Sequence, residues 1–248
     1  MTDSVLTVVT DRGRVRDHNE DAIGIDGWVL YGEAAGVLEL RLDASRPSTI
    51  AVCDGMGGHL AGEFASRMAA ELLTTDLGLA SSERASRDAD TVRPLLAQRV
   101  QDVADDINAI GDTHEEMKGM GTTTAGVVVL GDGGLLAFNV GDSTVLRCAD
   151  GRPTLLSVAD VGFGGGLTQA LGAIHVPLSV HTSVVDPVPG SAVVLCSDGL
   201  TDLVSAEVVA KALDDGRPDR DVARELVDLA CELGGHDNIT VAIVRFAE

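Results

Sequence analysis

Acidic residues stand beside apolar runs in four widely separated parts of the sequence. One apolar run of strand-like length stops at Asp54, and a glycine-rich loop and a helical pattern follow it. A carboxylate at the end of a strand is held rigidly, and Gly55 has no Cβ to keep a metal, water or phosphate away from the backbone. Oxygen ligands of this kind suit hard divalent cations such as Mg²⁺ or Mn²⁺. The acidic residues that could form such a site are Glu20, Asp21, Asp54, Asp198 and Asp237.

Each of these residues also has an ordinary structural interpretation. Asp54 and Asp198 could cap the helices that follow them. Glu20 and Asp21 could be solvated turn residues. Asp142 stands in a Gly-Asp-Ser segment and is more typical of a turn than of a ligand set.

Both helices and strands must position these residues. Amphipathic helical spacing covers residues 64–73 and 96–110, and we expect further helices at residues 206–213 and 221–233. Strands are expected at residues 4–10, 50–53, 122–130, 135–140, 144–148, 153–156, 178–185, 191–196 and 239–246. Paired helices around a run of antiparallel strands indicate a layered α/β sandwich.

Two stretches carry more specific expectations about strand pairing. Residues 122–156 contain strand patterns separated by glycine- and aspartate-rich turns, which predicts an antiparallel meander. Residues 28–42 are ambiguous and could form a hairpin around residues 32–36. A polar stretch at residues 80–90 is expected to be a surface loop.

Length and charge limit the possible classes of protein. The chain has 248 residues and no proline- or serine-rich linker, so we expect one domain over residues 1–248. Its formal net charge of −21 argues against nucleic acid and against anionic membrane surfaces as partners.

The expected cellular compartment follows from two features that we do not find in the sequence. We find neither a signal peptide nor an apolar run long enough to span a bilayer. The four cysteines are far apart and show no metal-binding spacing, so buried free thiols and a cytoplasmic location are expected.

The acidic residues belong to a set of seven motifs that occur in a fixed order. The set resembles the metal-dependent protein phosphatases of the protein phosphatase 2C type, in their compact bacterial form. The resemblance extends over residues 16–241, nearly the whole chain. It implies an α+β fold with four layers, α-β-β-α, in which two mainly antiparallel sheets lie between outer helices. The motifs are residues 15–21, 54–63, 119–123, 139–143, 167–172, 196–202 and 234–241.

The resemblance also implies which residues bind metal. One Mn²⁺ or Mg²⁺ ion would be held by Glu20, Asp54 and the backbone carbonyl of Gly55. The second would be held by Asp54, Asp198 and Asp237, with Asp54 shared between the ions. A water that bridges the two ions would attack the phosphorus of phosphoserine or phosphothreonine. Because these residues fall together in matched motifs, the ligand interpretation is preferred over the structural ones.

The resemblance implies two further roles, but it leaves the proton donor to the leaving alcohol without an obvious residue. Asp21 would orient a water on the metal, and Arg16 would bind the phosphate oxygens with its planar guanidinium. Without the motif around it, a surface ion pair would be the preferred interpretation of Arg16, which lies among acidic residues. Many relatives have a histidine that can protonate the leaving alcohol, but here that position is Met56. A metal-bound water is the first candidate for the proton donor, ahead of His59 or His18.

This sequence departs from the family pattern at two other places. Lys118 stands near the position where relatives carry an acid for a third, weaker metal, so that site is expected to be weak or absent. The Lys118 ammonium could take over its electrostatic role, or Glu115 or Glu116 could reach it. The flap beside the active site is reduced to residues 157–166, and its glycines predict flexibility. The shortening predicts a more open cleft, and with it either a broad tolerance of substrate sequence or selectivity supplied by docking elsewhere.

The expected partners are phosphorylated proteins that a serine/threonine kinase produces, and the expected state is a monomer. The alternative function is a non-catalytic or substrate-restricted phosphoprotein-binding module of the same fold, for example one tuned to a single regulatory protein of a sigma-factor pathway. A module without catalysis would be expected to have lost at least one of Arg16, Glu20, Asp54, Asp198 and Asp237.

Overall fold

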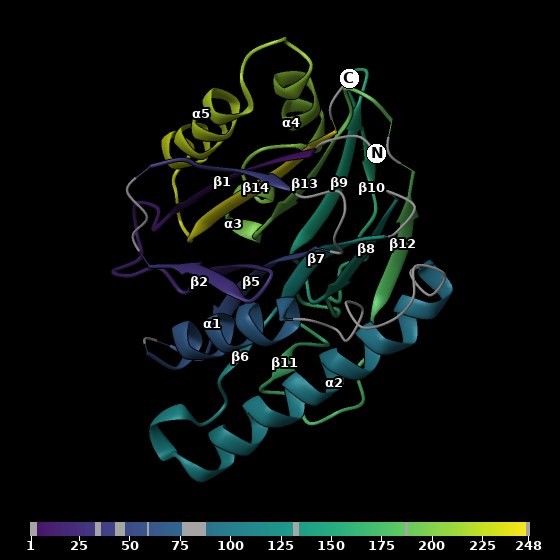
Figure 1. Ribbon diagram of the computed structural model, residues 1–248. Helices are drawn as coiled ribbons and strands as arrows, with labels where there is room; N and C mark the ends of the chain where they lie inside the picture. The colour runs from purple at the N-terminus through teal and green to yellow at the C-terminus, as the bar shows by residue number, and fades with distance from the viewer. Residues whose placement is uncertain are drawn as a thin grey trace.

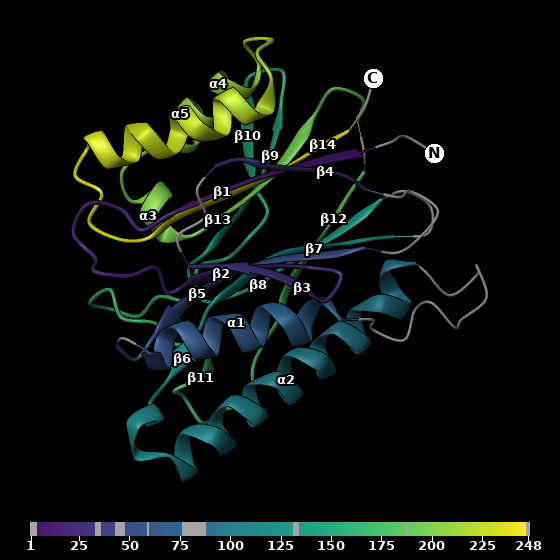
Figure 2. The ribbon, with the colours of Figure 1, turned by 60° about the vertical axis from the view of Figure 1, so that its left-hand side comes forward.

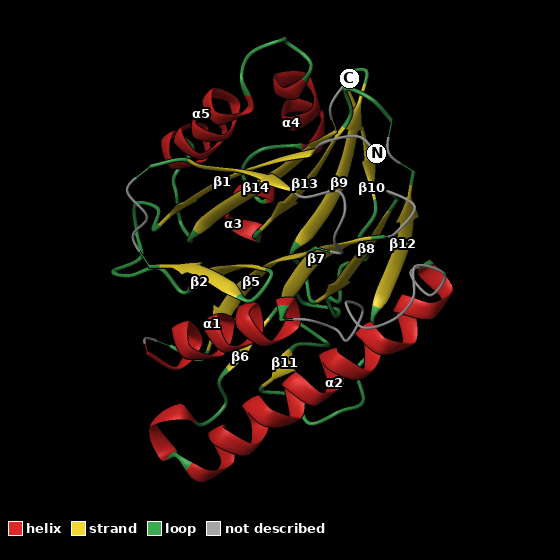
Figure 3. Ribbon diagram, viewed as in Figure 1, coloured by secondary structure: helices red, strands yellow, loops and turns green. Residues whose placement is uncertain are grey.

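The fold consists of two β-sheets packed face to face, with helices over both outer faces (Figures 1 and 2). Figure 3 shows the strands between the two groups of helices. This arrangement confirms the four-layer α+β sandwich. It is seen in a computed structural model that describes residues 4–32, 36–42, 48–58, 60–75, 88–130, 134–186 and 188–246.

Within the described residues, the first sheet has six antiparallel strands. Helices α4 (Ala206–Leu213) and α5 (Asp219–Glu232) cover it, and the short helix α3 (Asp198–Thr201) follows one of its strands. In spatial order the strands are β10 (Arg152–Leu155), β9 (Thr144–Ala149), β13 (Ala192–Cys196), β14 (Ile239–Phe246), β1 (Ser4–Asp11) and β4 (Leu38–Leu42).

The second sheet has eight antiparallel strands in the described part of the chain. Helices α1 (Leu60–Thr74) and α2 (Ala89–Thr113) cover it, and a 3₁₀ helix, η3 (Glu115–Met117), follows α2. Its main path is β11 (Leu171–Gly172), β6 (Gly121–Thr122), β5 (Thr49–Met56), β7 (Thr124–Val129), β8 (Leu135–Val140) and β12 (His181–Val185). Strand β2 (Asp21–Ile25) pairs with β5 and with β3 (Trp28–Tyr31).

The central strands are apolar at nearly every position because both of their faces are covered. In β5, Ala51 and Cys53 pack under the helices, whereas Ile50 and Val52 face the other sheet. Because side chains alternate along a strand, Asp54 shares the inner face with Ile50 and Val52. The strand therefore places Asp54 at the end of the core between the sheets.

Two predictions about strand pairing are wrong. Residues 28–42 do not form a hairpin, because β3 pairs with β2 in the second sheet and β4 pairs with β1 in the first. Residues 122–156 do not form one meander, because β8 belongs to the second sheet and β9 to the first. Thr123 also interrupts the strand predicted at residues 122–130. Local spacing identified the strands but did not reveal that the chain crosses between sheets.

Other expectations are confirmed, and some fall outside the described residues. Cys53, Cys148, Cys196 and Cys231 are buried free thiols. Among the described residues no helix combines the length and the apolar character needed to cross a membrane. His59 and most of the polar stretch at 80–90 lie outside the described residues.

Candidate active site

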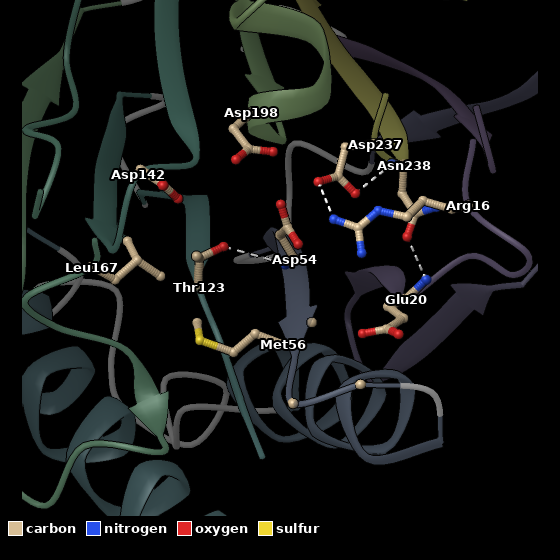
Figure 4. Close-up of a pocket in the computed structure, with 13 residues that line it drawn as sticks. Arg16, Glu20, Asp54, Met56, Thr123, Asp142, Leu167, Asp198, Asp237 and Asn238 are labelled. Atoms are coloured by element: carbon tan, nitrogen blue, oxygen red, sulfur yellow. Dashed lines mark hydrogen bonds and ion pairs between the residues drawn. The ribbon is translucent and has the colours of Figure 1, made fainter. Parts of the chain in front are cut away.

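A pocket of about 250 Å³ opens where the core between the sheets ends (Figure 4). Five of its lining side chains are carboxylates and one, Arg16, is a guanidinium. Its described lining consists of Arg16, Glu20, Asp54, Gly55, Met56, Gly57, Gly58, Thr123, Asp142, Leu167, Asp198, Asp237 and Asn238. Segments from both ends and the middle of the chain therefore meet here.

Asp54 is fixed by its strand and by the Thr-Thr pair beside it. The backbone oxygen of Asp54 accepts hydrogen bonds from Thr122 Oγ1 at 2.8 Å and from the Thr123 amide at 2.9 Å. The Asp54 amide donates to Thr123 Oγ1, and this hydroxyl also bonds Ser143 Oγ at 2.6 Å. These contacts use the main chain of Asp54 and leave its carboxylate directed into the pocket (Figure 4).

Asp21 lies directly opposite Asp54 in the β2–β5 pair. It is 1% exposed, and its Oδ2 accepts a 2.8 Å hydrogen bond from Ser197 Oγ. Its other oxygen, Oδ1, is buried and has no hydrogen-bond partner among the described residues. Asp21 is therefore a core residue rather than the solvated turn residue of the alternative interpretation, and it is not among the described residues that line the pocket.

Glu20 is held at the pocket by its main chain. Its amide donates to Asn238 Oδ1 at 2.8 Å, and its carbonyl accepts from Ser66 Oγ at 2.5 Å. Its side-chain Oε1 lies 2.8 Å from His18 Nε2. Glu20 is also buried, so it is not a solvated turn residue either.

Gly55 serves a packing role that differs from the expected one. A Cβ on Gly55 would lie 2.3 Å from the Gly62 carbonyl oxygen and 2.7 Å from that of Glu20. A Cβ on Gly62 would lie 2.0 Å from Glu20 Oε2. The two glycines allow α1 to approach β5 and Glu20 closely, so their space is filled by protein rather than left for a ligand.

Asp198 is the first residue of α3, directly after the N-cap residue Ser197. It lies one position past the N-cap, and its Oδ1 is buried without a hydrogen-bond partner among the described residues. The capping interpretation of Asp198 is therefore not supported.

Asp237 lies in the loop between α5 and β14 and is paired with Arg16. The two atoms Arg16 Nη2 and Asp237 Oδ2 are 2.5 Å apart, and Asp237 Oδ1 accepts a hydrogen bond from the Asn238 amide at 2.8 Å. The Arg16 side chain is half exposed and lines the pocket. Arg16 therefore forms the ion pair of the alternative interpretation, but it does so inside the pocket.

The carboxylates without a cationic partner have raised pKa values. Burial, followed by the repulsion of neighbouring carboxylates, raises the pKa of Asp198 to about 6 and that of Asp54 well above its usual range. Burial also raises the pKa of Asp21 to about 7, although the Thr240 and Ser197 hydroxyls oppose the shift. A bound cation would relieve this repulsion and favour the ionised carboxylates.

The carboxylates of the pocket are suitable ligands for hard divalent cations. Two of them already have hydrogen-bond partners, with which a cation would compete. The donors are carboxylates, and Asp198 brings an orphaned oxygen to the pocket. In the described part of the chain, no three acidic, imidazole or thiolate side chains are close enough together to form a metal site as they stand. His18 bonds Glu20 and Arg16 bonds Asp237, so each of these two carboxylates would have to exchange or share its partner in order to bind a cation.

That the third metal site is weak or absent stays a prediction, and two of the residues considered for it do not line the pocket. Lys118 is exposed and lies 3.9 Å from Glu115, and neither residue lines the pocket. Asp142, which the sequence indicated as a turn residue, does line the pocket. Burial, and then the charges of Asp202, Asp160 and Asp237, raise its pKa.

Sequence reasoning missed Asn238 as well as the place of Asp142. The Asn238 side chain accepts from the Glu20 amide and donates to the carbonyls of Arg12 and His18, each at 2.9 Å. It thereby joins the segment after β1 to the segment before β14. Asn238 follows Asp237 in a recognised motif, but its partners are more than 200 residues away in the chain, so local spacing carries no sign of its role.

Comparison with known proteins gives matches along the whole chain. A family model described as protein phosphatase 2C matches residues 38–227. A putative protein phosphatase 2C-type protein of Streptococcus pyogenes is 30% identical, with 97% of this chain and 96% of the relative covered. A Listeria monocytogenes serine/threonine phosphatase, stp, is 31% identical, with 95% and 93% covered. The solved S. agalactiae serine/threonine phosphatase has a TM-score of 0.79 and 27% identity, with 99% of this chain and 100% of that chain covered.

Proposed function

The chain belongs to the protein phosphatase 2C family and is a protein serine/threonine phosphatase, and from this premise we propose that its catalysis depends on two Mn²⁺ or Mg²⁺ ions. Glu20, Asp54 and the Gly55 carbonyl would hold one ion, and Asp54, Asp198 and Asp237 the other. When bound, the ions would activate water for attack on phosphorus and neutralise charge on the phosphate.

The observation that carries the proposal is the charge of the pocket. Its described lining combines five carboxylates with one guanidinium, so a phosphate dianion would be repelled if no cations were present. Two of the carboxylates, Asp54 and Asp198, also have raised pKa values, because they are buried and because other carboxylates lie close to them. An acidic pocket of this kind suits an anionic substrate only when cations fill the space between them.

The chain's own residues would bind and orient the substrate. Arg16 can keep one donor on Asp237 and direct its remaining N–H groups to phosphate oxygens, because a guanidinium carries five donors. Asp21 does not line the pocket but lies opposite Asp54, with one oxygen fixed by Ser197, so it would act only by orienting a water held on the metal.

The leaving alcohol must take up a proton. Met56 lines the pocket and has none to give, and none of the described lining residues is a histidine. His18 is already bonded to Glu20. We therefore assign the proton to water that enters the pocket. The proposed substrates are phosphorylated proteins that a serine/threonine kinase produces.

Hydrolysis of p-nitrophenyl phosphate with and without Mn²⁺ tests the metal dependence. We expect wild-type activity that EDTA abolishes and Mn²⁺ restores, and an Asp198→Ala variant that remains inactive at every Mn²⁺ concentration. Asp202→Ala is the matched control, because Asp202 ends the same short helix and is exposed. Activity that persists in EDTA, or in Asp198→Ala, would contradict the proposal.

A further inference from the structure

Asp160 is a buried carboxylate outside the pocket that contacts both segments forming one side of it. It is 8% exposed and accepts hydrogen bonds on both side-chain oxygens. The residue belongs to the shortened flap, and its partners lie in the crossing between the sheets, in the segment after the flap, and on β12.

The first segment is the crossing from β8 to β9. Asp160 Oδ2 accepts from the Gly141 amide at 2.9 Å, and the Asp160 amide donates to the Gly141 carbonyl at 3.0 Å. Gly141 has a φ of 97°, a conformation that favours glycine, and a Cβ there would lie 2.7 Å from the Thr123 side chain. The next residue is Asp142, so these two bonds fix the backbone from which Asp142 enters the pocket.

The second segment directly follows the flap. The Asp160 carbonyl accepts from the Thr168 amide at 2.8 Å, and Oδ1 accepts from Gln169 Nε2 at 2.8 Å. Between these anchors the chain makes a turn in which the Gly162 amide donates to the Gly166 carbonyl at 2.8 Å. Leu167, just before Thr168, lines the pocket. These hydrogen bonds anchor both ends of the turn, and the flexibility that its glycines predict stays a prediction.

A carboxylate is required at this position by its partners. His181 Nε2 lies 2.9 Å from Oδ1, the oxygen that also accepts from Gln169. Gln169 cannot reverse its amide without cost, because its Oε1 accepts from the Ser179 amide at 2.7 Å. An asparagine at position 160 could accept from Gly141 but would then turn an NH₂ group toward the Gln169 NH₂ group.

We propose that Asp160 is a positioning residue that sets the Asp142–Leu167 side of the pocket and thereby aligns protein substrates. The inference rests on the proposed phosphatase function. Figure 4 shows Asp142 and Leu167 on the side of Asp54 opposite Arg16. A phosphate held near Arg16 leaves the rest of a peptide to cross toward Asp142 and Leu167. A small ester such as p-nitrophenyl phosphate covers less of that side, so it should depend less on Asp160.

The test compares Asp160→Asn with the control Asp219→Asn on two substrates. Asp219 is a matched control because its side chain is 12% exposed and bonds Arg245 away from the pocket. For a phosphothreonine peptide we expect Asp160→Asn to raise KM about tenfold or more. The kcat/KM for p-nitrophenyl phosphate should fall by a clearly smaller factor. Hydrogen exchange at the Gly141 and Thr168 amides should accelerate in Asp160→Asn and not in Asp219→Asn.

Several outcomes would overturn the inference. These are equal losses on both substrates, no loss on either, or the same profile in Asp160→Asn and Asp219→Asn. If Asp160→Asn does not fold, Gln169→Leu removes one of the donors to Asp160 and must show the same substrate-dependent loss at smaller size; equal effects on both substrates would reject the inference. A wild-type protein inactive on both substrates would instead refute the proposed function.

Discussion

The two sides of the pocket are held by different chemistry. On the Arg16 side, the segments before β2 and before β14 are joined by the neutral amide of Asn238, and Asp237 and Glu20 already have partners. On the opposite side, the buried carboxylate of Asp160 fixes the crossing and the flap. Asp54 and Asp198 lie between these sides without a cationic partner.

This difference indicates where the pocket would favour a cation and where a cation would have to compete with a side chain. At Asp54 and Asp198, where burial and then repulsion raise both pKa values, a cation would favour the ionised carboxylates. At Asp237 it competes with a guanidinium, and at Glu20 with an imidazole. The carboxylates in the middle of the pocket should therefore dominate metal affinity, and those on the Arg16 side should adjust to it.

The largest effect is expected where the two sides meet. Asp54→Asn should lower kcat/KM by about 10³-fold, because the side chain proposed to serve both ions loses its charge. In EDTA the variant should melt no lower than wild type, since a buried carboxylate with a raised pKa contributes repulsion rather than stability. Steady-state kinetics and a thermal melt check both parts. A variant that melts much lower but stays active would reverse the interpretation.

The hydrogen bonds of the Asn238 side chain, on the Arg16 side of the pocket, should matter mainly for stability. Asn238→Ala leaves the Glu20 amide and the carbonyls of Arg12 and His18 without this partner, and we expect the free energy of unfolding to fall by about 2–4 kcal/mol. Urea denaturation measures the change. Gln98→Ala, which removes one exposed hydrogen bond to Asp102, is the control and should change it by less than about 0.5 kcal/mol. Equal effects in the two variants would show that Asn238 is not a special link.

Substitution of Arg16 should weaken substrate binding without weakening metal binding. Arg16→Ala should raise KM for p-nitrophenyl phosphate about 10- to 100-fold, because the phosphate loses its guanidinium partner. Mn²⁺ affinity should rise or stay constant, since Asp237 is freed from its ion pair. Arg16→Lys should restore only part of the binding, because an ammonium lacks the planar fork. Weaker Mn²⁺ binding in Arg16→Ala would contradict the competition described for Asp237.

The smallest effect is the pH dependence of the metal-free protein. In the folded state Asp198 and Asp21 have pKa values of about 6 and about 7, against an ordinary 3.8. The folded protein therefore binds more protons than the unfolded chain between about pH 4 and 7, so stability falls as pH rises through that range. In EDTA the protein should melt a few degrees lower at pH 7.5 than at pH 5.5, and Mn²⁺ should raise the melting temperature more at pH 7.5. A higher melting temperature in EDTA at pH 7.5 would contradict the raised pKa values that burial and repulsion give Asp198 and Asp21.

The sequence was sufficient to predict most elements and the residues that gather at the pocket. β8, α4 and β14 have the predicted bounds, because apolar periodicity reports directly on local structure. Glu20, Asp54, Asp198, Asp237 and Arg16 all line the pocket, as the motif resemblance predicted, although their roles stay predictions. The motifs succeed because each one marks the end of an element where a side chain is fixed.

What the sequence could not predict depends on contacts between distant segments. The Gly-Asp-Ser segment at residues 141–143 has the composition of a tight turn, yet it carries the chain from one sheet to the other. Asp142 therefore lines the pocket instead of lying in a surface turn. The sequence indicates only that Asp160 belongs to a shortened flap. Its partners Gly141, Gln169 and His181 are brought together by the fold, so local spacing does not reveal them.

The most direct test of the central claim is anomalous diffraction from crystals grown with Mn²⁺. The account predicts two manganese peaks in this pocket, about 3.5–4 Å apart, with the Asp54 carboxylate between them. The Asp237 side chain should contact one of the peaks. A single peak elsewhere, or manganese bound without contact to Asp54 and Asp198, would contradict it.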